Sequence, residues 1–247
     1  MSTKREKSGI AADQTRQTKE VQQMFDDIAP TYARVNHILS LSIDKLWRRH
    51  TVNIVERLRP RRILDLATGT GDLAIAMARR IKDVEICGAD LSAEMMAVAV
   101  RKVAALNLQN RITFTQCGAV EIGLEDGSID VVTIAFGIRN FENREASLAE
   151  IFRTLRSGGH LVILEFSNPR NRFVGWMYRI YSHKILPFIG GLISKNRRAY
   201  EYLPASVDEF PEPEEFIEIL KRSGFTNIAR HSQSLGIAQI YVAQRNS

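Results

Sequence analysis

The residues with the clearest chemical meaning lie in one short segment of the chain. An apolar run that contains Asp65 breaks into Gly69-Thr70-Gly71 and resumes at once as helical sequence. Glycines adopt backbone conformations that other residues avoid, and they leave no Cβ between the main chain and a ligand. A helix that starts at such a turn points its free N–H groups at that ligand. With Ala74 in the last position, the spacing fits a nucleotide-binding fingerprint, although this pattern is short.

A second carboxylate gives this turn its context. Asp90 ends the apolar run 84–90, at the distance from the glycines where nucleoside-binding sheets place a ribose-binding carboxylate. Asp90 and Ser92 also precede helical sequence, so a helix N-cap is the alternative. Asp65 favours a cationic ligand, because a carboxylate at that position would repel a phosphate. Together these residues resemble the first two motifs of class I S-adenosylmethionine-dependent methyltransferases, whose cofactor carries an ammonium and a sulfonium group.

Two further strand ends carry candidate site residues, because ligands of an open α/β sheet bind beyond the carboxyl ends of its strands. Gly118-Ala119 follows the third predicted strand and offers a small backbone suited to an adenine edge, with a plain strand end as the alternative. The segment 136–141 follows the fourth strand and places Arg139 and Asn140 between apolar residues.

Arg139 is the first catalytic candidate. Methyl transfer from a sulfonium is an in-line displacement, so the protein must hold the nucleophile close and aligned. An aromatic carbon becomes nucleophilic when an adjacent hydroxyl loses its proton, and a nearby guanidinium would stabilise the resulting phenolate. A structural salt bridge from Arg139 to Glu165 is the alternative. His183 and Tyr200 are candidate general bases, acting directly or through water, with packing or substrate lining as their alternative roles.

Alternating segments must position these residues. From residue 61 the sequence predicts strands at 62–67, 84–90, 111–116, 129–136 and 160–166, and helices at 71–81, 92–106 and 143–155. A turn at 157–159 is expected to end the last of these helices and to start the strand 160–166. Apolar strands that alternate with helices indicate a doubly wound, mostly parallel α/β sheet. Segments 225–231 and 236–243 are close enough to form a terminal antiparallel hairpin, which completes a seven-stranded, Rossmann-like sheet.

The remaining segments divide a single predicted domain, 1–247, into parts around this core. The charged start lacks apolar periodicity and predicts a disordered tail, and a helix at 18–28 is expected to break within 26–32. The expected parts are a tail at 1–15, an N-terminal helical cap at 16–60, a cofactor-binding core at 61–166, a substrate-covering helical insertion at 167–210, and a helix with the hairpin at 211–247.

Composition excludes several classes of protein. With 45% hydrophobic and 25% charged residues, the chain is typical of globular proteins. Two cysteines, Cys87 and Cys117, support neither a disulfide framework nor a metal site. No leader or membrane span is evident, so a cytoplasmic protein is expected. The net charge of +6 is compatible with nucleic acid, an anionic membrane surface or mere solubility.

Longer motifs are similar to the ubiquinone/menaquinone biosynthesis C-methyltransferase family over nearly the whole chain. The matching stretches are 25–32, 65–72, 89–92, 136–141, 165–169 and 200–206. The most specific among them are Gly137-Ile138-Arg139-Asn140 and Tyr200-Glu201-Tyr202-Leu203. One departure is Ala135, where some members carry serine, so a contact from that hydroxyl cannot exist here.

The resemblance implies S-adenosyl-L-methionine as cofactor and C-methylation of a polyprenylated quinol, either demethylmenaquinol or a ubiquinone precursor. The implied cofactor contacts are Asp65, Gly69, Thr70, Gly71, Asp90, Leu91, Gly118 and Ala119. Because such quinols live in the bilayer, the aromatic insertion and the basic helix before Pro60 are expected to contact an anionic membrane peripherally. A homodimer is a further partner that this sequence allows.

Four alternatives remain open at this point, and one of them is a non-catalytic binding module. A class I methyltransferase could instead act on another small aromatic compound. An RNA methyltransferase would suit the positive charge, but the chain lacks a Pro-Cys nucleophile and an amine-binding Asn/Asp-Pro-Pro motif. An NAD-dependent oxidoreductase is disfavoured by Asp65 and by the terminal hairpin.

Overall fold

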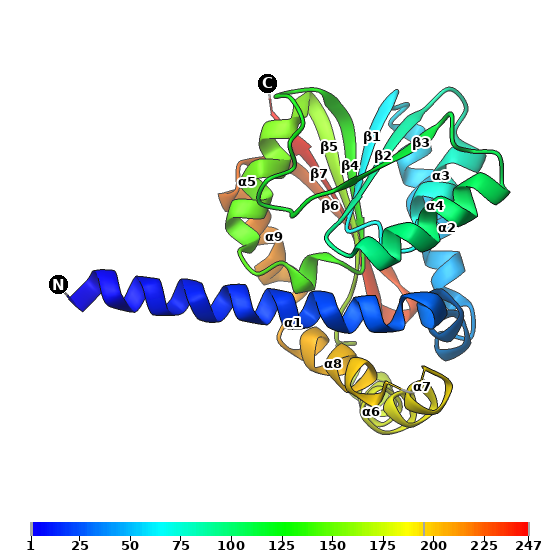
Figure 1. The fold of residues 1–247 in the computed structure, drawn as a ribbon, viewed down its shortest axis with the longest axis vertical. Coiled ribbons are helices and arrows are strands. Elements are labelled where there is room, and N and C mark those ends of the chain that lie inside the picture. The colour runs from blue at the N-terminus through cyan, green and yellow to red at the C-terminus, as the bar shows by residue number, and fades with distance from the viewer. Residues whose placement is uncertain (1, 195, 247) are drawn as a thin grey trace.

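A seven-stranded sheet in the order β3-β2-β1-β4-β5-β7-β6 runs through the centre of the computed structural model, which describes residues 2–194 and 196–246 (Figure 1). Strands β1 to β5 pair in parallel, and β7 pairs antiparallel with both β5 and β6. The strands are β1 (Arg62–Leu66), β2 (Glu85–Asp90), β3 (Ile112–Gln116), β4 (Ile129–Ala135), β5 (Leu155–Phe166), β6 (Phe225–Gln233) and β7 (Ala238–Arg245). The predicted doubly wound sheet with a terminal hairpin is therefore confirmed.

Helices cover both faces of this sheet. The described helices are α1 (Ser2–Leu39), α2 (Ile43–Arg57), α3 (Asp72–Arg80), α4 (Ala93–Ala105), α5 (Arg144–Thr154), α6 (Arg172–Ile180), α7 (Leu186–Ser194), α8 (Arg197–Asp208) and α9 (Pro213–Arg222), with short helical turns η1 (Ile138–Asn140), η2 (Tyr181–Ile185) and η3 (Ser234–Gly236). Successive strand residues alternate between faces: Ile63 belongs to an apolar cluster with residues of α2 and α3, and Leu64 belongs to another with residues of α5 and α9. Both positions are buried, which explains the nearly continuous apolar strands.

Strand β5 begins earlier than the sequence predicts. The expected strand starts at His160, after the turn 157–159, but Leu155 already pairs with Ile129 and the register shifts before Val131 pairs with His160. Gly159 permits this irregularity, since a Cβ there would lie 2.8 Å from the carbonyl oxygen of Arg156. The β-bulge thus absorbs the predicted turn within the strand.

Helix α1 differs most from the expectation. It begins at Ser2, where the sequence predicts a disordered tail, and Figure 1 shows its first half projecting from the body. Lys, Arg, Glu, Gln and Ala are good helix formers, so a charged segment without apolar periodicity can extend a helix that is anchored farther along. The predicted break at 26–32 is also wrong, because α1 continues through Pro30.

Packing explains why α1 tolerates Pro30. An interior proline costs a helix about 3 kcal/mol. The same helix buries Ile28, Ala29, Val35 and Leu39 in an apolar cluster with residues of α4, α7 and α8. Each large apolar side chain contributes about 1.5–3 kcal/mol on full burial, so these contacts together outweigh the proline.

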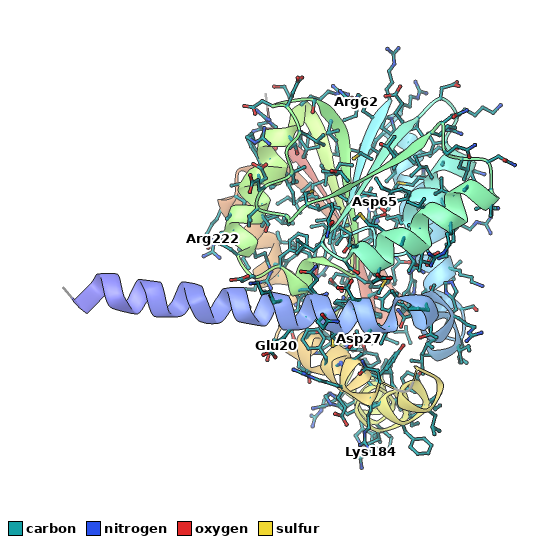
Figure 2. The ribbon with its side chains drawn as sticks, in the orientation of Figure 1. Glu20, Asp27, Arg62, Asp65, Lys184 and Arg222 are labelled. Carbon is teal, nitrogen blue, oxygen red and sulfur yellow. The ribbon has the colours of Figure 1, made fainter. Side chains whose placement is uncertain are left out.

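The insertion between β5 and α9 is helical, as expected. Its helices α6, α7 and α8 lie with α1 at the end of the molecule where the parallel strands finish (Figure 1). Figure 2 shows Asp65 deep in the molecule, on the core side of α1, and Lys184 at the outer end of the insertion. Among the described residues, no helix is long and apolar enough to cross a membrane.

Candidate active site

A cavity of about 320 Å³, here the first cavity, lies at the carboxyl ends of β1, β2 and β4. The sheet order reverses between β1 and β4, and an open α/β sheet binds its ligand at such a switch point. Seven of the eight predicted cofactor residues line this cavity: Asp65, Gly69, Thr70, Asp90, Leu91, Gly118 and Ala119. The eighth, Gly71, lies behind the lining.

The two glycines of the turn have different tasks. Gly69 has a φ of 55°, and a Cβ added to it would meet nothing within 4 Å, so its backbone faces open space in the first cavity. Gly71 has a φ of 76°, and a Cβ there would lie 3.0 Å from the Cβ of Ala99 in α4. The first glycine therefore leaves room for a ligand, and the second permits close packing of the turn against α4.

Asp65 lies beneath this turn and is almost fully buried. Its two carboxylate oxygens accept hydrogen bonds from the hydroxyls of Thr133 and Thr68, both at 2.6 Å. Burial raises the pKa of Asp65 to about 6, against the lowering effect of the two hydroxyls. The carboxylate is therefore mostly ionised at neutral pH, but at a cost in desolvation that a cationic ligand would reduce.

Asp90 holds the glycine turn in place. Its carboxylate accepts hydrogen bonds from the backbone N–H of Gly69 at 2.7 Å and of Ser92 at 2.9 Å. The N-cap of α4 is Ser92, whose hydroxyl accepts from the N–H of Met95 at 3.1 Å. Burial raises the pKa of Asp90. Each carboxylate oxygen can accept a second hydrogen bond, so Asp90 can hold the turn and still receive ligand hydroxyls.

The charged residues in the described lining of the first cavity are mostly acidic, although Asp72 pairs with Lys102 at 2.6 Å. The lining carries Asp65, Asp72, Asp90 and Glu142 against one guanidinium, that of Arg48. This charge balance, the open space at the glycine turn and the small residues after β3 fit a nucleoside that bears cationic groups, as S-adenosylmethionine does.

Helix α1 forms the opposite wall of the first cavity. Val21, Gln22 and Phe25 line it, and the amide of Gln22 donates a hydrogen bond to the carbonyl oxygen of Leu91 at 3.0 Å. The hydroxyl of Ser92 donates to the carboxylate of Asp26. These two contacts tie α1 to the loop after β2, so the helix closes the site.

Backbone strain marks the strand ends at the switch point. Ala67 after β1 has a φ of 55° and Phe136 after β4 has a φ of 59°, values that residues with a Cβ rarely adopt. A Cβ added to Gly137 would lie 2.5 Å from the Cβ of Ala67, so only glycine fits between the two loops. Strain of this kind persists where the surrounding structure fixes it, often at functional sites.

A second cavity, of about 270 Å³, adjoins the first. Phe25, Tyr32, Arg48 and Phe136 line both cavities, so they form the boundary between them. The rest of the second cavity is mostly apolar and aromatic, with Trp47, Phe166, Tyr178, Tyr181, Tyr200 and Tyr202 in its wall. A flat ring would fit among these side chains, next to a ligand of the first cavity.

Arg139 lines this second cavity and is buried. Its Nη1 lies 2.8 Å from Oε1 of Glu165, its Nε donates to the hydroxyl of Ser206 at 3.2 Å, and its guanidinium carbon lies 5.7 Å from the ring centre of Phe166. Burial lowers the pKa of Arg139, but the nearby Glu165 outweighs it and the net shift is upward. Arg139 is thus a permanent cation in the cavity wall, and the predicted alternative, an ion pair with Glu165, exists as well.

The two predicted bases lie in different places. Tyr200 is buried, lines the second cavity and packs against Gly190, where an added Cβ would lie 2.4 Å from the tyrosine ring. The Nε2 of His183 lies 3.1 Å from a carboxylate oxygen of Asp208, and both side chains are more than two-fifths exposed. His183 lines neither cavity, so the structure does not bring it to Arg139.

Two residues at the boundary were not among the predicted site residues. Arg48 extends from α2 and forms an ion pair with Asp44, which is 4% exposed. Asp44 also accepts a hydrogen bond from Ser40 and pairs with His37, both at 2.6 Å. Tyr32 faces the boundary from α1. Asp44, four residues before Arg48 in the same helix, could have indicated that Arg48 is held in a buried ion pair. The sequence-based prediction instead counted Arg48 among the exposed basic residues of that helix.

Comparison with known proteins matches residues 12–245 to the ubiE/COQ5 methyltransferase family. A demethylmenaquinone methyltransferase of Thermus thermophilus is 45% identical over 222 residues, which cover 90% of this chain and 100% of that protein. The ubiquinone/menaquinone biosynthesis C-methyltransferase UbiE of Geotalea daltonii is 44% identical over 232 residues, which cover 94% of this chain and 98% of that protein. The similarity therefore includes the sheet, the cap and the insertion.

A solved structure shares the fold at much lower identity. Phosphoethanolamine N-methyltransferase 2 of Haemonchus contortus, in complex with S-adenosyl-L-methionine, matches with a TM-score of 0.59 and 18% identity. The match covers 80% of this chain and 52% of that one, so this chain spans about half of that enzyme's length.

Proposed function

This chain belongs to the ubiE/COQ5 methyltransferase family, and from that premise we propose that it transfers a methyl group from S-adenosylmethionine to a ring carbon of a polyprenylated quinol. The relatives described above are named for demethylmenaquinone and for ubiquinone/menaquinone biosynthesis. The proposed acceptor is accordingly demethylmenaquinol or a ubiquinone precursor. The RNA and oxidoreductase alternatives receive no support from these relatives.

One observation supports the proposal most directly: an acidic cavity and an aromatic cavity share a wall. Asp65 and Asp90 in the first cavity suit the cationic methyl donor, and Arg139 in the second suits an oxygen anion. Phe25, Tyr32, Arg48 and Phe136 lie at the boundary. Two ligands held on the two sides of this boundary would meet there, which is the alignment that an in-line displacement requires.

When bound, S-adenosylmethionine supplies an electrophilic methyl group. The protein's share of the chemistry is to raise the nucleophilicity of the quinol. Arg139 and Arg48 place two guanidinium groups at the second cavity and favour loss of a proton from the quinol hydroxyl. Burial raises the pKa of Tyr32 above its usual value, so its hydroxyl stays protonated at neutral pH and serves as a donor to the quinol oxygen.

Proton removal is assigned to Tyr200, directly or through water: its hydroxyl would accept the quinol proton while passing its own proton to water. Of the two predicted bases, it is the one that lines the second cavity. Ligands that fill both cavities would displace water from them, which strengthens the electrostatic effect of the two guanidinium groups. We also propose that the protein contacts an anionic membrane peripherally and takes the quinol from it, and that it forms a homodimer.

A direct test combines binding and turnover. Calorimetry of the purified chain should detect binding of S-adenosylmethionine and none of NADH or a short RNA. Incubation with radiolabelled S-adenosylmethionine and each quinol in mixed micelles should give a labelled ring-methylated lipid, identified by mass spectrometry. Binding of the methyl donor without a labelled quinol would reject the acceptor, and absence of donor binding would reject the whole assignment.

A further inference from the structure

We infer that the outer surface of α6 and α7 docks on an anionic phospholipid bilayer, and that the quinol tail enters the second cavity between the α1–α2 turn and η2. The inference rests on the proposed function, since it specifies where a lipid substrate reaches the site. The sequence-based expectation named both the aromatic insertion and the basic helix before Pro60 as membrane contacts, and the inference assigns the apolar contact surface to the insertion.

The docking face is defined by five exposed apolar residues of α6 and α7: Phe173, Trp176, Met177, Phe188 and Leu192. Each is at least half exposed, from 53% for Met177 to 67% for Leu192. None of the residues of α6 is buried, although most of them are apolar. The rings of Phe173 and Trp176 stack with their centres 6.3 Å apart, so they form one apolar surface. Large exposed apolar surfaces mark interaction sites, and aromatic side chains favour the membrane interface.

The charge around this face specifies the kind of surface that it fits. Between residues 168 and 200 the sequence contains seven Lys or Arg residues and no Asp or Glu. Three of them form ion pairs with glutamates outside this segment, namely Arg170, Arg197 and Arg198. Arg172, Arg179 and Lys184 belong to α6 and η2 themselves, and Figure 2 shows Lys184 at the outer end of the insertion. Lysines and arginines next to an anionic leaflet each contribute about 1 kcal/mol of attraction. Two copies of the same cationic face would repel one another, so the charge favours lipid over a second copy of this chain.

The second cavity connects this face with the reaction site. Its described lining includes Tyr178 of α6, Tyr181 of η2 and Leu186 of α7, so the docking helices form part of its wall. Two other lining residues reach the surface: Leu41 is 81% exposed and Ile43 is 40% exposed. Both lie at the α1–α2 turn, and the hydroxyl of Tyr181 donates a hydrogen bond to the carbonyl oxygen of Leu39 beside them. The cavity therefore has an apolar mouth next to the docking face.

The size of the cavity makes such a mouth necessary. Ligand sites commonly enclose about 300–1,000 Å³, and this cavity of about 270 Å³ is slightly smaller than that range. It can hold a ring but not a long isoprenoid chain in addition. The chain must leave past Leu41 and Ile43, and its apolar surface then continues into the lipid on which α6 and α7 rest.

Vesicle flotation tests the docking face. The full chain should float with vesicles that contain phosphatidylglycerol, with at least tenfold weaker binding to pure phosphatidylcholine and a loss of binding as salt rises. The triple variant Phe173→Ser, Trp176→Ser, Phe188→Ser should bind at least tenfold more weakly. Val100→Ser is the matched control, because Val100 on α4 is 49% exposed and lies outside the docking face. Because all the substituted side chains are exposed, the thermal midpoint of each variant should match that of the wild type.

Charge reversal tests the specificity for anionic lipid. The double variant Arg172→Glu, Lys184→Glu should bind phosphatidylglycerol vesicles at least tenfold more weakly. The control double variant Arg79→Glu, Lys82→Glu, whose substitutions lie in and just after α3, should bind as the wild type does. If the triple variant floated with the vesicles as much as the wild type does, the assignment of the docking face would be wrong. The docking face would also be overturned if the wild type sedimented as a dimer, the triple variant sedimented as a monomer, and both bound lipid equally. The face would then be a subunit interface.

Turnover tests the mouth and separates this inference from the proposed function. Leu41→Asp should lower methylation of a long-tailed quinol in vesicles at least tenfold more than it lowers methylation of a tail-less quinol. Equal effects on both quinols would overturn the assignment of the mouth. If the wild type methylates neither quinol, the proposed function fails, and flotation still decides whether the docking face binds lipid.

Discussion

The buried pair of Arg139 and Glu165 allows catalysis to be separated from structure by a double-mutant cycle. The variants are Arg139→Met, Glu165→Gln and the two combined. The side chains are 2% and 0% exposed, and their charged atoms lie 2.8 Å apart. With an effective dielectric constant of about 20, this separation corresponds to an attraction of about 6 kcal/mol, of which desolvation of the two charges offsets a large part.

Each single variant should lose stability, because it leaves one buried group without its charged partner. Glu165→Gln leaves a guanidinium that cannot lose its proton, and a destabilisation of about 3–5 kcal/mol is expected. Arg139→Met leaves the Glu165 carboxylate with the N–H groups of Arg139 and Phe166, at 3.3 Å and 2.8 Å, so a smaller loss is expected. The double variant should recover to within about 1–2 kcal/mol of the wild type, since neither charge then remains.

Urea denaturation and labelled methyl transfer provide the two readouts. Glu165→Gln should shift the urea midpoint down by roughly 1–2 M, and the double variant should shift it back. Turnover of the quinol should fall about 100-fold or more in every variant that lacks Arg139, including the stable double variant. Binding of S-adenosylmethionine should not change, because Arg139 lines the second cavity and not the first. Near-normal turnover by the double variant would refute the catalytic role and leave Arg139 as a structural cation.

Three further predictions follow from the first cavity and its boundary. Gly69→Val should weaken binding of S-adenosylmethionine at least tenfold in calorimetry, whereas Gly123→Val, at a φ of 72° and with equally open surroundings, should cause similar strain without that loss. Because the pKa of Asp65 is raised to about 6, affinity for the cationic donor should fall up to tenfold per pH unit below pH 6; a persistent slope in Asp65→Asn would assign it to another group. Asp44→Asn should raise the KM for quinol about tenfold, because Arg48 loses the ion pair that positions it, and adding Arg48→Met should raise the KM no further. Additive effects on the KM would show that the two residues act independently.

The cofactor half of the site could be predicted because its parts are local in sequence. Asp65 and Gly69 lie four residues apart, and the strand periodicity fixes where Asp90 ends β2. The topology of a parallel sheet then brings these strand ends to one edge without further information. The same pattern predicted that Gly71 contacts the ligand. Its close approach to Ala99 is a tertiary contact, which a local sequence pattern cannot predict.

The acceptor half depends on long-range packing and was predicted less well. His183 and Tyr200 both lie in the aromatic insertion, and sequence gave no reason to prefer one of them. The structure buries Tyr200 and pairs His183 with Asp208 at the surface. Tyr32 was placed in a helix break because Pro30 normally ends a helix, yet packing of α1 on α4 and α7 outweighs that preference.

The course of α1 has a consequence for the order of events in a catalytic cycle. Gln22 belongs to the wall of one chamber and Asn36 to the wall of the other, while Phe25 and Tyr32 border both. A helix moves largely as a rod, so a displacement that opens one chamber also opens its neighbour. Binding of the nucleotide and of the lipid would therefore be coupled through α1, although the lipid chamber keeps its own apolar mouth at Leu41 and Ile43.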